Sequence, residues 1–273
     1  MTVDLQREKD TAIVAARMAG NIINDVYQTK YTIDYKRGDN SPVTVADRKA
    51  NQKIHEIVRE SFPEYGWLSE ETVDSKDRLG ARRVWIVDPM DGTMEFINRI
   101  PEFSVSIGLI EGSFPILGVV YNPRSEELFW AIRGEGTWCN GRRVEVPTTA
   151  RLKEAKILSS RSETKRGEWN EFRELFTAQP MGSIAYKLAC IAEGKADASF
   201  TLVPKNEWDI CAGTILVQEA GGQVTTLKNT PILFNQPKTL LQGLVASNGH
   251  LHSELMTLIT PRLKDRHYDD GRK

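Results

Sequence analysis

The sequence predicts an α+β fold in which helices cover two β-sheets, and three features support this prediction. Two segments near the N-terminus have apolar residues at helical spacing. A run of short strands separated by turns follows over residues 103–146, and from residue 147 onward strands alternate with helices. Two sheets with helix layers between and outside them are the natural assembly of such a chain. We therefore expect an N-terminal α+β part, residues 1–146, with a large antiparallel sheet, and a C-terminal α/β part, residues 147–273.

The composition indicates a large core and excludes several kinds of partner. The 273 residues include 36 Lys and Arg and 37 Asp and Glu. This balance lacks the excess of positive charge that is typical of proteins that bind a nucleic-acid polymer or a membrane surface. The cysteines Cys139, Cys190 and Cys211 are far apart in apolar surroundings, so they are predicted to be buried reduced thiols. No apolar run approaches the ~20 residues that span a bilayer, and the N-terminus has no apolar signal core. These features predict a cytoplasmic protein.

The first helix is predicted over residues 4–28, where apolar residues recur along one face. The polar segment 30–41 then carries Lys36, Arg37 and Gly38 and is expected to form a mobile loop. This positive loop either closes over a phosphate or is simply solvated.

A second helix is predicted over residues 44–61, and its first residues, TVAD, match a capping box. Asp47 is therefore either a helix cap or a site residue. A short strand over residues 65–69 then delivers Glu70 and Glu71. Because successive side chains of a strand point to opposite sides, only one of these glutamates is expected to face the site.

Residues 85–93, WIVDPMDGT, form the most informative stretch of the chain. Residues 85–87 predict a short buried strand. Pro89 lacks a backbone donor and fixes φ, so the chain is expected to turn at Asp88.

Around this turn, the carboxylates of Asp88 and Asp91 and the carbonyl of Met90 can converge on one point, while Gly92 permits a tight backbone path. Oxygen ligands of this kind suit Mg²⁺. The same pattern also fits a plain turn, because Asp-Pro and Asp-Gly pairs are common turn formers.

A turn of helix is expected over residues 94–99, with its N-terminus near Gly92 and Thr93, where free backbone N–H groups can hold an anion. The strands that follow are predicted over residues 103–110, 116–121, 128–132, 137–139 and 142–146, the last two joined by an Asn-Gly hairpin.

The second half is predicted to contain strands at residues 157–159, 198–202 and 244–246 and helices at residues 168–177, 183–193 and 208–220. Asp209 opens the last of these helices. By itself this position fits a cap or a partner of the helix dipole.

Taken together, Glu70 after a strand, the WIVDPMDGT stretch, and Trp208-Asp209 leading to the EAGG of residues 219–222 closely resemble the inositol monophosphatase superfamily of Mg²⁺-dependent, lithium-sensitive phosphatases. The resemblance spans roughly residues 10–260. It implies a layered αβαβα sandwich.

Position by position, the resemblance implies a site for two or three Mg²⁺ ions, most of whose ligands lie in the N-terminal part. The implied ligands are the side chains of Glu70, Asp88, Asp91 and Asp209 and the carbonyl of Met90. Glu70, Thr93 and Asp47 would take part in catalysis, with Thr93 and Asp47 orienting and deprotonating the attacking water. The implied substrate contacts are Gly92, Thr93, Gly182, Ser183, Lys187 and Asp209.

The chemistry agrees with this set, because clustered Mg²⁺ ions supply the nucleophile, the charge neutralisation and the leaving-group assistance that phosphate-monoester hydrolysis needs. No covalent residue is required. The four histidines lie outside every motif, which disfavours a phosphohistidine or zinc mechanism.

Within the superfamily the sequence is most similar to the CysQ-like 3′(2′),5′-bisphosphate nucleotidases, which act on adenosine 3′,5′-bisphosphate. The segment DGTMEFINR at residues 91–99, Glu102 with the phenylalanine after it, and SSRS at residues 159–162 carry this similarity. Met94 departs from the lysine usual in those enzymes. Lys205 is the one cation in the segment before Trp-Asp.

Two positions bear on the substrate. Inositol monophosphatases have a glutamate seven residues before the Trp-Asp aspartate, where this chain has Leu202. Lys187 lies where the CysQ-like enzymes carry a lysine, and it either meets the second phosphate of a bisphosphate or is an ordinary solvated lysine.

The alternatives are an inositol-1-monophosphatase or other small sugar phosphate phosphatase, and, more distantly, a non-catalytic phosphate or metal sensor. A sensor is expected to have lost a carboxylate, and none is missing. The expected partner is a small-molecule phosphate ester, with no nucleic-acid polymer and no membrane span; a homodimer is compatible with the sequence.

Overall fold

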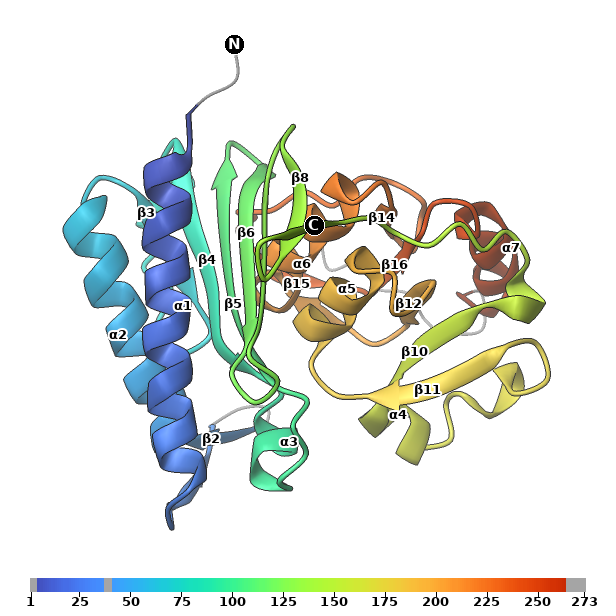
Figure 1. Cartoon of the computed structure of the whole chain (residues 1–273), viewed down its shortest axis with the longest axis horizontal. Coiled ribbons are helices and arrows are strands. Elements are labelled where there is room, and N and C mark those ends of the chain that lie inside the picture. The colour runs from blue at the N-terminus through green and yellow to red at the C-terminus, as the bar shows by residue number, and fades with distance from the viewer. Residues whose placement is uncertain (1–3, 37–40, 264–273) are drawn as a thin grey trace.

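The structure, a computed structural model, describes residues 4–36 and 41–263 and is built from five layers. Figure 1 shows α1 (Gln6–Tyr27) and α2 (Val45–Ser61) on the outer face of one sheet. Helices α5 (Ile184–Ala192) and α6 (Glu207–Glu219) lie between that sheet and a second one, and α7 (His252–Leu263) lies beyond the second sheet. This order of layers confirms the α+β fold and the αβαβα sandwich that the resemblance implies.

The first sheet contains seven strands, and neighbouring strands are antiparallel except for the first pair, which is parallel. The large antiparallel sheet that the sequence predicts thus has one parallel pair, at this edge. In spatial order the strands are β3 (Gly66–Ser69), β4 (Arg83–Asp91), β5 (Ser104–Glu111), β6 (Phe114–Asn122), β7 (Glu127–Ile132), β8 (Gly136–Cys139) and β9 (Arg142–Val144). The predicted strands of the first half, including the Asn-Gly hairpin, are confirmed.

The second sheet has five strands and is mixed. In spatial order they are β11 (Thr177–Met181), β10 (Lys156–Ser160), β12 (Ala198–Thr201), β16 (Leu244–Ser247) and β14 (Gln223–Thr226). Strand β10 is parallel to both of its neighbours, whereas β16 is antiparallel to β12 and β14. Two short pairs complete the strands: β1 (Ile33–Tyr35) with β2 (Pro42–Thr44), and β13 (Lys205–Asn206) with β15 (Leu240–Leu241).

The helices are α1 (Gln6–Tyr27), α2 (Val45–Ser61), α3 (Thr93–Ile97), α4 (Arg161–Lys165), α5 (Ile184–Ala192), α6 (Glu207–Glu219) and α7 (His252–Leu263). Short 3₁₀ turns occur at Asp77–Gly80, Leu152–Glu154 and Asn170–Phe172. The predicted helices over residues 4–28, 44–61, 183–193 and 208–220 are confirmed. Among the described helices, none combines the length and the apolar composition needed to cross a lipid bilayer.

The prediction of a helix over residues 168–177 is wrong. This segment holds a 3₁₀ turn and the start of β11, and α4 precedes it. Its apolar residues Trp169, Phe172 and Phe176 do have helical spacing, but their rings pack on one another and on Phe200. The helical spacing of these aromatic residues therefore reflects their packing against one another and does not indicate a continuous helix. The sequence also gave no prediction of α7, β11 or β14.

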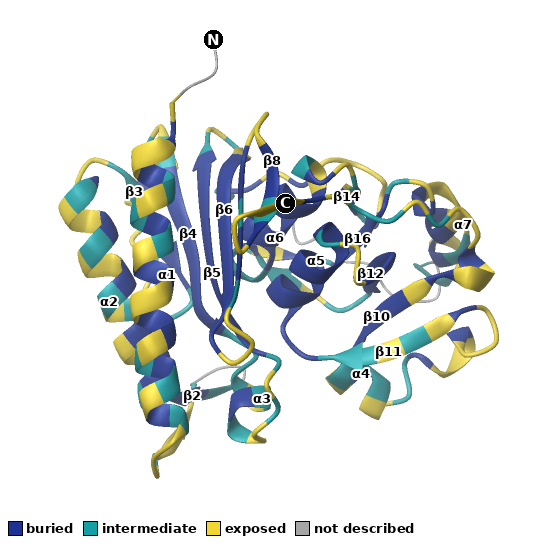
Figure 2. Ribbon diagram, in the orientation of Figure 1, coloured by how far each residue is buried: buried dark blue, intermediate teal, exposed yellow. Residues whose placement is uncertain are grey.

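Three apolar clusters fill the spaces between the layers: one under α1 and α2, one around α5 and α6 between the sheets, and one under α7. Figure 2 shows the difference between these helices, since α1 and α2 expose their outer faces while α5 is buried all round. The three cysteines are buried and free, as predicted. Helix α6, which carries Asp209, is therefore fixed from both sides.

Two paired glycines allow α6 to lie close to the first sheet. Gly108 of β5 and Gly118 of β6 are cross-strand partners. A Cβ atom on Gly118 would lie 2.6 Å from the carbonyl oxygen of Ala212, and one on Gly108 would lie 2.6 Å from the Sγ of Cys211. A side chain at either position would push α6 away from the sheet.

We expect Gly118→Ala to destabilise the protein by about 1–3 kcal/mol, because overpacking forces the helix or the strand to shift. For a domain of this size the expected loss in Tm is about 2–12 °C. The matched control is Gly80→Ala, where nothing lies within 4 Å of the new methyl group. Thermal unfolding of the three proteins checks this, and equal Tm values would contradict the close approach of α6.

Candidate functional site

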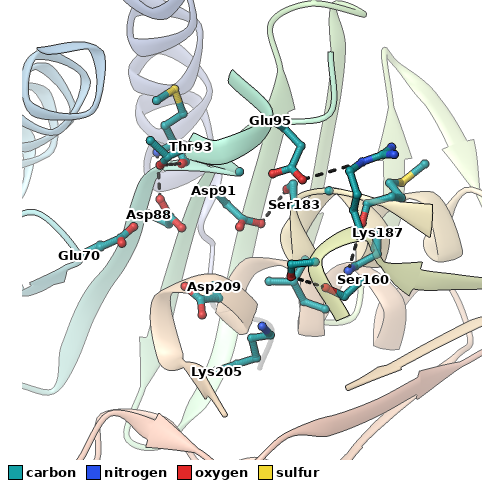
Figure 3. A pocket seen from close by; sticks show the side chains of 17 residues that line it. Glu70, Asp88, Asp91, Thr93, Glu95, Ser160, Ser183, Lys187, Lys205 and Asp209 are labelled. Carbon is teal, nitrogen blue, oxygen red and sulfur yellow. Dashed lines mark hydrogen bonds and ion pairs between the residues drawn. The ribbon is translucent and has the colours of Figure 1, made fainter. Parts of the chain in front are cut away.

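A pocket of about 190 Å³ lies where the end of β4 meets the first turns of α5 and α6. Figure 3 shows four carboxylates, Glu70, Asp88, Asp91 and Asp209, around it. They come from three separate segments of the chain: the residue after β3, strand β4 and the start of α6. The expected metal ligands are therefore brought to one pocket, and the carbonyl residue Met90 lines it as well.

Strand β4 continues through Pro89, so the expected turn at Asp88 is wrong. In the pairing with β5, Asp88 lies opposite Ser106 and Asp91 opposite Ser104, which leaves one extra residue on β4. A bulge of this kind accommodates a proline, because the bulged segment does not need its backbone donor. The bulge presents both aspartates to the pocket, and the N–H of Met90 donates to Asp88 Oδ1 at 2.9 Å.

Asp91 is held by the start of α5. The hydroxyl of Ser183 donates to Asp91 Oδ2 at 2.6 Å, and the N–H of Ala185 donates to the same oxygen at 2.7 Å. Gly92 follows with φ of 101°, and a Cβ atom there would lie 2.9 Å from the carbonyl oxygen of Glu102. Only glycine fits both this conformation and this space.

Asp47 caps α2 and also contacts Thr93, a residue of the pocket lining. Its Oδ2 accepts from the N–H and the hydroxyl of Thr44, each at 2.7 Å, which completes the capping box of α2. Its Oδ1 accepts from the Thr93 hydroxyl at 3.0 Å. Burial raises the pKa of Asp47 to about 6, although the bonds from Thr44 oppose this shift. At neutral pH Asp47 is therefore largely ionised and can accept a proton through Thr93, which lines the pocket.

Glu70 and Glu71 do not point to opposite sides, so that expectation is wrong. Both carboxylates contact the Nζ of Lys36, at 2.7 Å and 2.5 Å. They follow the last residue of β3, where the alternation of a strand no longer applies. Burial opposes the charge on Lys36, but the two carboxylates outweigh it and raise its pKa. Glu70 is nevertheless the one of the pair that lines the pocket.

Lys36, a described cation of the predicted positive loop, is therefore paired with the carboxylates of Glu70 and Glu71 and is not simply solvated. The expectations for Arg37 and Gly38 lie outside the described residues.

Asp209 lies in the first turn of α6, where its Oδ2 accepts from the N–H of Asn206 at 2.9 Å in a capping box. Burial raises the pKa of Asp209, and the charges of Asp91 and Glu70 raise it further, while Lys205 lowers it. Asp209 therefore caps α6 and also lines the pocket.

The carboxylates oppose one another's ionisation. Burial raises the pKa of Asp88 well above its usual value, and Glu70, Asp91 and Asp209 add to this shift. Burial also raises the pKa of Asp91, against the bonds from the start of α5. Such a set of hard oxygen donors with unbalanced negative charge fits Mg²⁺ chemically. Among residues 4–36 and 41–263, no three Asp, Glu, His or Cys side chains are placed so that they could hold a metal ion together.

The opposite wall of the pocket carries cations. Lys187 is only 4% exposed, so the alternative of a solvated lysine is wrong. Its Nζ has one weak bond, at 3.5 Å, to the carbonyl oxygen of Met181. Burial lowers the pKa of Lys187 to about 8, and the charge of Lys205 lowers it too. Lys205 also lines the pocket, whereas Leu202 packs against the apolar cluster under α7.

Gly182 and Ser183 line the pocket with the other predicted substrate contacts. Glu95, Ser160 and Arg161 also line the pocket, although the sequence did not point to them as site residues. The SSRS segment was the available signal for the last two, but it could not be placed without the position of α4.

Comparisons with known proteins show which family this chain resembles. The family model described as "Inositol monophosphatase family" matches residues 4–267. A fructose-1,6-bisphosphatase/inositol-1-monophosphatase of Thermotoga maritima is 31% identical over 92% of this chain and 94% of its own length. An inositol-1-monophosphatase of Caulobacter vibrioides is 35% identical over 81% and 88%. The Nus factor SuhB of Escherichia coli K12 is 36% identical over 78% and 83%.

Solved structures are similar throughout the chain. The inositol monophosphatase TM1415 of Thermotoga maritima has a TM-score of 0.83 at 29% identity, covering 94% of this chain and 98% of that one. CysQ of Bacteroides thetaiotaomicron has a TM-score of 0.74 at 30% identity, covering 89% and 98%.

We expect Asp88→Asn to stabilise the protein in EDTA. Above the usual aspartate pKa of about 4, the unfolded chain ionises Asp88 while the fold resists ionisation, so folding stability falls as pH rises toward the raised pKa. Asparagine removes this penalty and can still accept from Met90. A rise in Tm of at least about 2–4 °C at pH 7.5, equivalent to ~1 kcal/mol, is expected.

The control for this experiment is Asp25→Asn on the exposed side of α1. It should leave Tm unchanged. An Asp88→Asn protein less stable than the unaltered protein in EDTA would contradict the repulsion among the pocket carboxylates.

Proposed function

The chain belongs to the inositol monophosphatase family of phosphatases, and on this premise we propose that it is a Mg²⁺-dependent phosphate monoester hydrolase, specifically a 3′(2′),5′-bisphosphate nucleotidase. Removal of the 3′-phosphate of adenosine 3′,5′-bisphosphate is the reaction we put first. The observation that carries the proposal is one pocket with carboxylates on one wall and buried or half-buried lysines on the other.

The carboxylate wall is suited to hold the metal. We propose that Glu70, Asp88, Asp91 and Asp209 are the side-chain ligands and that the Met90 carbonyl is a further one. Two or three bound Mg²⁺ ions would neutralise the phosphoryl oxygens, supply the nucleophilic water and assist the leaving oxygen. Without such cations the ionised carboxylates repel an anionic ester, so the protein is expected to be inactive.

Residues of the chain would direct the water and the phosphate. The Thr93 hydroxyl donates to Asp47 and also lies 3.3 Å from the Met90 carbonyl oxygen. In this position Thr93 can orient the attacking water, and Asp47 can receive a proton through it. We propose that the backbone of Gly92 and the start of α5 at Ser183 contact the phosphate.

The cation wall supports the substrate class. Lys187 is nine-tenths buried with little hydrogen bonding of its own, an arrangement that favours an anionic ligand. Lys205 adds a second positive charge to the same wall. An ester with a second phosphate could place it there while its first phosphate meets the metals. The similarity to the CysQ structure is consistent with this assignment.

The second candidate is a phosphatase of inositol 1-phosphate or fructose 1,6-bisphosphate, which the names of the Thermotoga and Caulobacter relatives favour. Leu202 argues against a polyol, because it packs in an apolar cluster and does not line the pocket. A ring hydroxyl that loses its acceptor is disfavoured by about 1–3 kcal/mol. A phosphate-release screen over adenosine 3′,5′-bisphosphate, inositol 1-phosphate and fructose 1,6-bisphosphate tests the proposal.

We expect phosphate release to require Mg²⁺ and to distinguish the two adjacent glutamates. Glu70→Gln should lower kcat at least about 100-fold, because it removes a proposed ligand, whereas Glu71→Gln should lower it less than about tenfold. Both changes take one carboxylate from Lys36, so they are matched for that loss. Activity in EDTA equal to that in Mg²⁺, or a larger effect of Glu71→Gln at equal Tm, would contradict the metal assignment.

We expect Lys187→Met to raise KM for adenosine 3′,5′-bisphosphate about tenfold and to leave KM for inositol 1-phosphate within twofold, because only the former brings a second phosphate. Methionine keeps the buried side chain's bulk without its charge. Lys165→Met, on the exposed side of α4, is the control and should change neither. Equal effects on both substrates, or a better kcat/KM for inositol 1-phosphate, would favour the second candidate.

A further inference from the structure

A carboxylate outside the proposed ligand set links the two halves of the chain beside the pocket. Glu102 lies between α3 and β5, and its Oε2 accepts from Arg161 Nη2 at 2.5 Å and from the N–H of Gly182 at 2.7 Å. The side chain of Glu102 is 20% exposed, so this is not a fully hydrated surface pair. Charge-assisted bonds of this length are among the stronger ones in proteins. One oxygen thus contacts both Arg161, at the start of α4, and Gly182, two residues before the start of α5.

The segment that Glu102 holds is tightly packed on its other side. Arg161 Nη2 also donates to the carbonyl oxygen of Pro180 at 3.3 Å, and its Nε lies 3.9 Å from Glu95 Oε1. A Cβ atom on Gly182 would overlap the side chain of Glu95. The turn from Pro180 to Gly182 therefore has little room to move while the Glu102 contacts persist.

The next residue, Ser183, has a backbone conformation that a serine rarely adopts. Its φ is 49° and its ψ is 111°, outside the ordinary regions for a residue with a side chain. Such a conformation persists only where the surroundings hold it. The surroundings here include Glu102, which accepts from the Gly182 N–H, and Asp91 and Ser104, which bond to the Ser183 hydroxyl.

Ser183 and Ala185 direct Asp91. Both donate to Asp91 Oδ2, which leaves Oδ1 as the oxygen not engaged by this turn. Hydrogen bonds of this kind fix the orientation of a ligating carboxylate. The position of the turn therefore determines which way the Asp91 carboxylate faces.

We propose that Glu102 is a positioning residue that sets the Mg²⁺ affinity of the pocket by fixing the turn at residues 180–183 and, through it, Asp91. This inference rests on the proposed metal-dependent function. Glu102 itself would contact neither the metal nor the substrate. Its effect passes through two hydrogen-bonded steps, from Glu102 to Gly182 and from Ser183 to Asp91.

The test compares Glu102→Ala, Glu102→Gln and Glu111→Ala with the unaltered protein. Glu102→Ala removes both bonds, while Glu102→Gln keeps an oxygen for the Gly182 N–H and loses the ion pair. Glu111, at the other end of β5, pairs with Arg82 and Arg83 and is the matched control for loss of a carboxylate with arginine partners. Mg²⁺ affinity is measured by calorimetry on metal-free protein, with Tm measured alongside.

We expect Glu102→Ala to weaken Mg²⁺ binding about tenfold, the scale known for groups that orient metal ligands. Glu102→Gln should recover part of this loss, and Glu111→Ala should bind Mg²⁺ like the unaltered protein.

Two results would overturn the proposal: Mg²⁺ affinity of Glu102→Ala within twofold of the unaltered value, or equal weakening in Glu111→Ala. If Glu102→Ala does not fold, Glu102→Gln decides by the same measure, since full affinity in that variant with a lower Tm would assign Glu102 to stability alone. If the unaltered protein binds Mg²⁺ but releases no phosphate, the proposed function is refuted. The Mg²⁺ affinities of the variants would still test the role of Glu102.

Discussion

The gathering of negative charge in one pocket is the constraint on which the rest of this structure depends. Burial raises the pKa values of Asp88, Asp91 and Asp209, and neighbouring carboxylates raise those of Asp88 and Asp209 further. Each accepts a backbone N–H, which lowers its pKa, but this effect is the smaller one. A fold selected only for stability would not place these carboxylates together, since uncompensated buried charge is among the costliest features of a protein interior. The remaining imbalance is what a divalent cation would offset.

The core and the pocket are therefore not separable. Strand β4 presents two of the aspartates through a bulge, and α6 presents the third from its first turn. The distance between these elements is set by Gly108 and Gly118, which let the helix lie directly on the sheet. A methyl group in the sheet would move Asp209 relative to β4 without touching the pocket itself.

Local rules in the sequence predicted the features that depend on neighbouring residues, such as the capping box of Thr44 and Asp47 and the strands of the first sheet. The bulge at Pro89 was missed because a proline ends a regular strand and permits a bulged one, and the choice depends on pairing with β5. The burial of Lys187 was not predictable either, because it follows from the position of α5 between two sheets. The same holds for Glu102, whose partners are distant in sequence.

The two walls of the pocket have opposite charge, and this gives the cation wall a property of its own. Lys187 has a pKa of about 8, so near neutral pH it keeps its proton but can lose it on modest alkalinisation. An anion bound next to its Nζ would stabilise the charged form and raise this pKa. Anion binding and protonation of Lys187 are then linked, so an anion contacting Lys187 should bind more weakly as pH rises above 8. The carboxylate wall has the opposite linkage, since metal binding favours ionised Asp88, Asp91 and Asp209. The pocket as a whole is therefore best suited to binding a metal and a phosphate ester together. This requires a pH at which Lys187 is charged and the bound cation keeps the aspartates ionised.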